Sequence, residues 1–299
     1  MKVIIPIDQK MFNFFLDKNE PIELSTKWTL KGNLTEEIHY LETHIDDEKQ
    51  WRKPLDQALA IFRLFKSGFV KINRVLKDDF EPINRLNYYH PWNDYMMKEG
   101  LRIHTADPLV VENKEMGSLK KHFQDWEEID PFNHYSLRTF MNFHFVPRIF
   151  DKFINLAIAF DGLLFPDPDD YSDRYEFAKR LSSLLEPTHN EILHDECLKF
   201  YILRNMIVHN LVKVDMISKV DKNGNEFWPF TIEFENHLRK LFISLGKSHL
   251  DSPPLKNSTN WKNFEAGFNK CNCPSYNNKT MAKNKSSNID TFLENTYKR

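Results

Sequence analysis

The sequence contains few cysteines and few glycines, and these shortages exclude several classes of protein. Its 299 residues include three cysteines, an odd number too small for the disulfide framework of a secreted domain. Only eight glycines occur, and none belongs to a phosphate-binding loop, a dinucleotide fingerprint or a nucleophile elbow. The familiar nucleotide-binding and serine-hydrolase classes therefore find no support, and the scarcity of cysteine predicts a reducing, cytoplasmic location.

An excess of basic charge and a long apolar run are also missing. Lysine and arginine total 41 residues against 43 aspartates and glutamates, which leaves a formal net charge of -2. This balance excludes binding of nucleic acid through overall basicity, although a local basic patch is compatible with it. The longest apolar stretch, Phe153 to Phe165, is interrupted by Asn155 and Asp161, whereas a membrane helix needs about 20 apolar residues. We therefore expect no membrane partner.

The residue patterns divide the chain into three stretches and indicate an α+β fold class. Residues 1–145 are predicted to form a mixed or β-rich domain, interpreted as a sensing domain, and residues 146–250 an all-α helical domain. Residues 251–299 form a polar tail. From Lys256 onward it contains 10 asparagines and eight basic against three acidic side chains. We expect a loose linker, with one short helix near Ile289 to Tyr297.

Alternating apolar residues and turn signals suggest elements of the first stretch. Val3–Ile7 and Ile22–Trp28 are predicted strands, and Ala58–Phe65 fits either a strand or a helix. Ser67–Gly68 predicts a turn before a further strand at Phe69–Ile72.

Spacing of three and four residues predicts helices from residue 148 onward. The first helix is expected over Arg148–Phe165, and a second runs from its cap Asp173 to Leu185. A third has Thr188 as its cap and Glu191 in a capping box. A hairpin of Val212–Val220 and Phe227–Phe230 around Asp221–Asn225 follows, and then a helix over Glu233–Leu245 that ends at Gly246.

The third of these helices carries polar groups at its C-terminal end, beside an apolar stripe that includes Tyr201, Ile202 and Val208. Asn205 and His209 are four residues apart and share a helix face. A helix that ends in a polar cap, with a solvated Arg204, would explain this pattern without any function.

Arg204-Asn205 followed by His209 resembles the Arg-x4-6-His signature of HEPN domains, the higher eukaryote and prokaryote nucleotide-binding family. Phe150–Leu164 resembles the first helix of the Apea-like branch, with Asp161 in place of the usual Glu. Phe177–Leu181 resembles the second helix and Tyr201–His209 the third. Asn210 follows the histidine where many members carry Gly. The resemblance covers about Arg148 to Leu250.

This resemblance implies an up-and-down helical bundle, often dimeric, and a metal-independent endoribonuclease without a cofactor. His209 would transfer protons near neutral pH, and Arg204 would bind phosphate oxygens. Asn205 would orient the imidazole or contact the substrate. Asp161 would restrain Arg204 or His209, with Tyr201 as a further supporting residue. No metal ligand set is predicted, because Cys271 and Cys273 lack a second pair nearby.

The expected partners are RNA, a second copy of the chain and an antitoxin or regulatory protein, in a defence or toxin-like stress role. On a straight helix Arg204 and His209 point about 140° apart and rise about 7.5 Å, so a composite site across a homodimer would unite them. Arg148 to Val214 carries 11 acidic and eight basic side chains, so the basic tail would have to support RNA binding. Two alternatives stay open: a non-catalytic nucleotide- or RNA-binding module, and an interaction protein whose N-terminal domain senses a partner.

Overall fold

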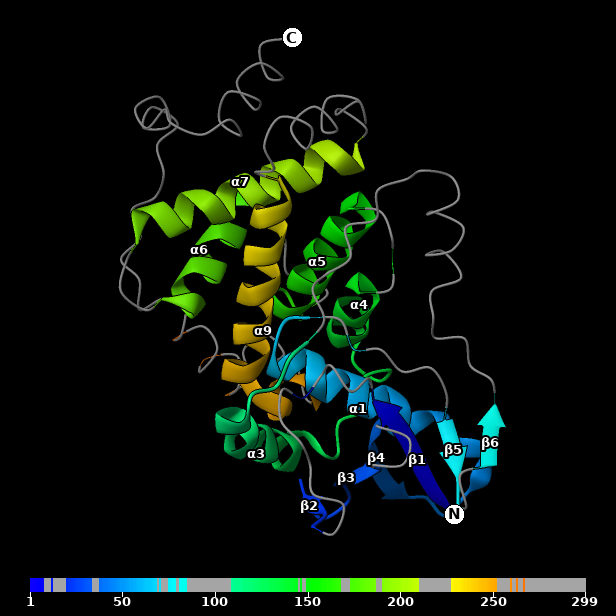
Figure 1. The fold of residues 1–299 in the computed structure, drawn as a ribbon. Helices are drawn as coiled ribbons and strands as arrows, with labels where there is room; N and C mark the ends of the chain where they lie inside the picture. Colours follow the sequence, from blue (N-terminus) through cyan, green and yellow to red (C-terminus); the bar gives the residue numbers. More distant parts are fainter. Residues whose placement is uncertain are drawn as a thin grey trace. The chain divides into compact units, whose positions relative to one another are not determined.

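The computed structural model describes two compact units, residues 1–148 and 149–299, each treated by itself. Within them it describes residues 1–7, 12, 20–33, 38–68, 70, 75–78, 81–84, 109–144, 146, 149–167, 173–186, 190–209 and 227–251, with the single positions 259, 262 and 266. Strands and helices both occur, which confirms the α+β class at that coarse level (Figure 1).

A six-stranded antiparallel sheet forms the first unit, in the order β2-β3-β4-β1-β5-β6. The central strand β1 is buried along nearly its whole length and pairs with β4 in a register that sets Ile5 opposite Leu41. Its apolar run predicted this strand correctly. The strands span Lys2–Ile7 (β1), Ile22–Glu23 (β2), Thr29–Asn33 (β3), Ile38–His44 (β4), Val75–Lys77 (β5) and Glu81–Asn84 (β6).

The helices of the first unit pack through aromatic side chains. The ring of Phe62 meets Phe123 edge-on at 5.4 Å, and Trp28 meets the same ring at 6.0 Å. The elements are η2 (Glu48–Gln50), α1 (Arg52–Phe65), η3 (Asn113–Glu115), α3 (Met116–Trp126) and α4 (Tyr135–Phe143).

One prediction for this unit needs correction. Only the first two residues of Ile22–Trp28 pair as a strand, because the N–H groups of Leu24 and Ser25 both donate to the carbonyl of Trp28 and close a turn. Of the two alternatives for Ala58–Phe65 the structure has the helix, so Gly68 follows a helix. Gly68 has a φ of 137°, and a Cβ there would lie 2.4 Å from the backbone of Leu109. The position therefore requires glycine for close approach and for its dihedral.

Four helices of the second unit surround a cluster of phenylalanines centred on Phe200. The rings of Phe177 and Phe234 stack on either side of Phe200, with centroids at 6.0 and 4.3 Å. Phe153 and Phe160 complete the contact from a third helix. The helices are α5 (Ile149–Leu164), α6 (Arg174–Leu185), α7 (Glu191–Val208) and α9 (Phe227–Asp251). One fully buried ring thus joins all four, since Phe177 belongs to α6 and Phe234 to α9.

The caps and limits of these helices agree in part with the sequence pattern. Asp173 caps α6 as predicted, with Oδ1 accepting from the N–H of Tyr175 at 2.7 Å. The cap of α7 is Asn190 and not Thr188, because the Asn190 side chain accepts from the N–H of Leu193. As predicted, the helix that contains Glu233–Leu245 ends at Gly246, whose φ of 73° is non-helical, and a second helical segment of α9 follows this kink to Asp251.

Phe227–Phe230, predicted as the second strand of a hairpin, is the first turn of α9. Phe230 and Phe234 are four residues apart, and both rings contact Phe200. Residues with this spacing lie one above the other on one face of a helix, so the helical conformation allows both rings to pack against Phe200. Pro229 is tolerated because first-turn N–H groups lack helical partners. The rest of the predicted hairpin, Thr188, the helix near Ile289 and all of the predicted strand Phe69–Ile72 except Val70 lie outside the described residues.

Asp56 on α1 gives the first unit a pH-dependent stability. Its side chain is 9% exposed, and burial raises its pKa to about 6 against the opposing effect of Arg52 at 3.4 Å. The folded state therefore holds this proton more tightly than the unfolded chain does. The contribution of the protonated Asp56 carboxyl to the free energy of unfolding is complete below about pH 4 and is lost as the pH rises through 6.

We expect Asp56→Asn to remove this dependence. Between pH 4 and 7 the free energy of unfolding of the variant should gain on the order of 2 kcal/mol relative to the wild type. Urea denaturation at several pH values would measure the difference. Asp125→Asn, at an exposed aspartate, is the matched control and should show a much smaller change. If the free energy of unfolding varied with pH in the same way for Asp56→Asn and the wild type, Asp56 would not be the source of the pH dependence.

Candidate functional site

The predicted site lies where α7 ends. His209 is the C-terminal cap of the helix, and its backbone N–H donates to the carbonyl of Asn205 at 2.9 Å. The backbone of His209 has left the helical region, with φ −85° and ψ 9°. The polar residues singled out in the sequence therefore lie in the last turn of a helix that Phe200 anchors to the core.

Arg204 is held by groups on three sides. Its Nη2 lies 2.9 Å from Oδ2 of Asp161 on α5, and its Nη1 donates to Oδ1 of Asn205 at 2.7 Å. The guanidinium carbon also lies 5.5 Å from the centroid of the Tyr201 ring, one turn earlier on α7. The Arg204 and Asp161 side chains are 27% and 24% exposed. The guanidinium is thus fixed in place but still open to solvent.

His209 stands apart from this group. Its side chain is exposed, and among the described residues its imidazole makes no hydrogen bond or ion pair with the side chains of Arg204, Asn205 or Asp161. The amide oxygen of Asn205 accepts from Arg204, so in this structure Asn205 orients the guanidinium. Of the two roles open to Asp161, the geometry places it on Arg204.

The apolar stripe that was expected to bury a two-fold interface is mostly used inside the protomer. Tyr201 and Ile202 are 7% and 6% exposed, and Tyr201 packs on the ring of Phe177 at 5.1 Å. Val208 alone of the three is exposed, at 53%. Sequence spacing correctly groups these residues on one face but does not show that the face is already covered.

These groups define what the arrangement can do chemically. Arg204 offers a fixed positive charge with N–H groups beyond the two used by Asp161 and Asn205, which suits a phosphate. The negative end of the α7 dipole favours cations at this position. Within the part of the chain that the structure describes, no three histidine, cysteine or acidic side chains are placed to hold a metal ion.

No family model, curated protein or solved structure matches the chain. Among the described helices, none combines the length and the apolar character needed to span a bilayer.

The Asp161–Arg204 pair is expected to contribute measurably to stability. We predict a coupling energy of about 1 kcal/mol in a double-mutant cycle of Asp161→Asn and Arg204→Gln, because both groups are partly shielded from water. Chemical denaturation of the four proteins would measure it. The exposed pair Lys121–Asp125, at 2.7 Å with side chains 73% and 51% exposed, is the control and should couple more weakly. Equal coupling in both cycles would show that the partial burial has no effect.

Proposed function

We propose that the protein is a metal-independent endoribonuclease that cleaves RNA through attack of a 2′-hydroxyl. The observation that carries the proposal is an arginine oriented by Asp161, Asn205 and Tyr201 in the last turn of a helix whose C-terminal cap is the exposed His209. The resemblance to HEPN domains names the same residues, and the implied up-and-down bundle belongs to this proposal.

The chemistry needs a base, an acid and a positive charge, and these side chains can supply them. His209 removes the proton from the 2′-hydroxyl or protonates the leaving 5′-oxygen. Arg204 binds the nonbridging oxygens, on which charge builds up as O2′ attacks phosphorus. Asp161 keeps the guanidinium aligned, so little conformational entropy is lost when a phosphate binds. The products would be a 2′,3′-cyclic phosphate and a 5′-hydroxyl.

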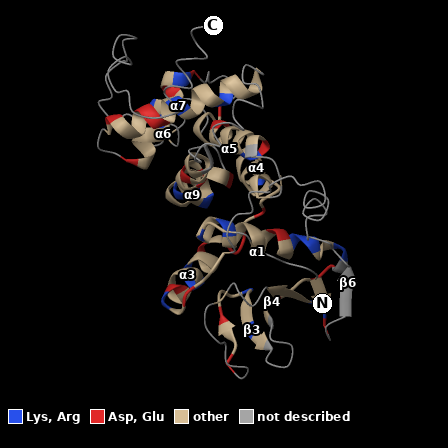
Figure 2. Ribbon diagram, turned by 45° about the horizontal axis from the view of Figure 1, so that its top comes forward, with Lys and Arg blue, Asp and Glu red and all other residues tan. Residues whose placement is uncertain are grey.

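Attraction of RNA to the second unit needs more positive charge than the site provides. Asp161 offsets the charge of Arg204, and α6, α7 and α9 each carry both basic and acidic residues (Figure 2). Phosphate neutralisation supplies much of RNA affinity. We therefore assign the electrostatic contribution to the basic tail from Lys256 onward.

We expect His209→Ala to reduce cleavage of total RNA by about 100-fold or more in the presence of a chelator, because proton transfer contributes on that scale. Arg204→Lys should lose about tenfold or more, since an ammonium cannot reproduce the planar fork. His44→Ala and Arg174→Lys, at residues outside the site, are matched controls and should cleave like the wild type. Gel electrophoresis and analysis of the RNA ends would measure both effects.

The mechanism also predicts which substrates resist cleavage. A DNA of the same sequence, or an RNA with 2′-deoxy sugars, should stay intact because the nucleophile is missing. Cleavage that persists in His209→Ala, or that disappears with the chelator, would contradict the proposal.

A homodimer with a composite site is part of the proposal, because Arg204 and His209 are five positions apart in the sequence and their side chains do not meet within one chain. Val208 and His209 are both exposed at the helix end, where a second copy could bring its own His209 to Arg204. Isologous contact would create two such sites.

Mixing Arg204→Ala and His209→Ala subunits tests this arrangement. In each mixed dimer one composite site keeps both groups, so an equal mixture should recover roughly a quarter of the wild-type activity. Light scattering would establish the oligomeric state, and each variant alone should remain inactive. An active monomer, or no recovery from proven mixed dimers, would mean that both groups act within one chain.

A non-catalytic nucleotide- or RNA-binding module is the second candidate, because Arg204 is engaged with Asp161 and Asn205 while His209 stands apart. On this alternative the wild type would bind RNA without cleaving it, and His209→Ala would bind equally well. The defence or toxin-like role, the antitoxin partner and the sensing role of the N-terminal unit stay predictions.

A further inference from the structure

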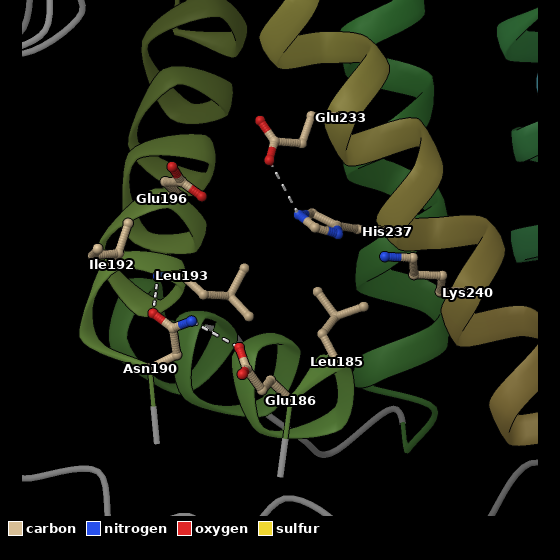
Figure 3. Close-up of a pocket in the computed structure, with 9 residues that line it drawn as sticks. All are labelled: Leu185, Glu186, Asn190, Ile192, Leu193, Glu196, Glu233, His237 and Lys240. Carbon is tan, nitrogen blue, oxygen red and sulfur yellow. Dashed lines mark hydrogen bonds and ion pairs between the residues drawn. The ribbon is translucent and has the colours of Figure 1, made fainter. Parts of the chain in front are cut away.

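A cavity of about 480 Å³ lies among α6, α7 and α9 of the second unit. Figure 3 shows Glu196 and Glu233 at one end and Glu186 at the other, with Leu185 and Leu193 between them. The volume falls in the range of small-molecule sites, about 300–1,000 Å³. The walls therefore present two acidic ends, with the leucines and the ammonium of Lys240 between them.

The charge of the lining favours a cation. Three carboxylates face one ammonium, that of Lys240. Burial raises the pKa of Glu196, and repulsion from Glu233 raises it further, so these two carboxylates on α7 and α9 interact across the cavity. A positive group placed between them would relieve this repulsion.

His237 adds a hydrogen-bonding group at the same end. Its side chain is 13% exposed, and within the described chain neither buried ring nitrogen has a hydrogen-bond partner. Nε2 lies 4.0 Å from Oε1 of Glu233. Burial and the nearby Lys240 lower the pKa of His237 to about 4, so the ring is neutral at pH 7. A neutral imidazole can accept a hydrogen bond from an ammonium group without repelling it.

The opposite end can hold a second cation. Oε2 of Glu186 accepts from Nδ2 of Asn190 at 2.7 Å, which orients the carboxylate. A carboxylate accepts several hydrogen bonds, so this contact does not saturate Glu186. Leu185 and Leu193 between the two ends suit methylene groups.

We propose that the cavity binds a small aliphatic diamine, with one ammonium between Glu196, Glu233 and His237, the other at Glu186, and the carbon chain against Leu185 and Leu193. A single metal ion would not fill the cavity, and these side chains do not form a metal ligand set among the described residues. The site lies on other side chains than the proposed RNA site and does not depend on the proposed endoribonuclease activity.

Isothermal titration calorimetry of the full chain with 1,4-diaminobutane tests the proposal. Butylamine should bind about tenfold more weakly or worse, because it leaves one acidic end unpaired, and 1,4-butanediol should not bind measurably. No binding of the diamine at millimolar concentration, or equal binding of all three compounds, would overturn the proposal.

Substitutions distinguish binding of the diamine in the cavity from general attraction of a cation to acidic residues elsewhere on the protein. Glu233→Gln and Glu196→Gln should each weaken the diamine about five- to tenfold, whereas Lys240→Gln should tighten it because a repelling ammonium is removed. Asp151→Asn removes the same charge from exposed α5 outside the cavity and should change nothing. Circular dichroism would confirm folding, and Lys240→Gln keeps the test decisive if a glutamate variant unfolds. Equal effects of Glu233→Gln and Asp151→Asn would overturn the site.

Discussion

The packing of Phe200 between Phe177 and Phe234 is the contact on which the second unit depends. Burial of one aromatic side chain contributes a few kcal/mol, and the aromatic pairs around it add about 0.5–1.5 kcal/mol each. The position of everything on α7 therefore follows from where this ring sits.

The Asp161–Arg204 ion pair follows from that core by simple spacing. Phe160 meets Phe200 edge-on at 5.4 Å, Asp161 is the next residue on α5, and Arg204 lies one turn beyond Phe200 on α7. The cavity follows in the same way on the other side of the ring. Glu196 lies one turn before Phe200, and Glu233 precedes Phe234 directly. One ring therefore separates two polar sites along a single helix.

Sequence periodicity predicts the helices well because their apolar faces are broad and regular. The limits of α5 and the Asp173 cap of α6 agree with the pattern to within a residue or two. The errors have a common cause: short aromatic runs such as Phe227–Phe230 fit a strand or a helix equally well, and only the core decides which forms. The pattern of the last turn of α7 also identifies Arg204 and Asn205, whose side chains hydrogen-bond, whereas the side chain of His209 stands apart from them.

What the sequence could not supply is the choice of partners. Asp161 is 43 residues from Arg204, so its pairing with that side chain, and not with His209, depends on the packing of α5 on α7. The cavity is harder still to predict, because its lining comes from three helices and local spacing within one helix does not show which of them meet.

The pairing has a consequence for any anionic ligand of Arg204. A free guanidinium attracts phosphates over a distance set by the ionic strength, whereas one paired with Asp161 presents almost no net charge beyond a few ångströms. Its remaining N–H groups act only at contact, through directed hydrogen bonds. Under the proposed function the site would therefore align a phosphate that has already arrived, and capture from solution would have to come from charges elsewhere in the chain. Such a separation of capture from alignment would make an acidic helical unit compatible with a phosphate-binding role of Arg204.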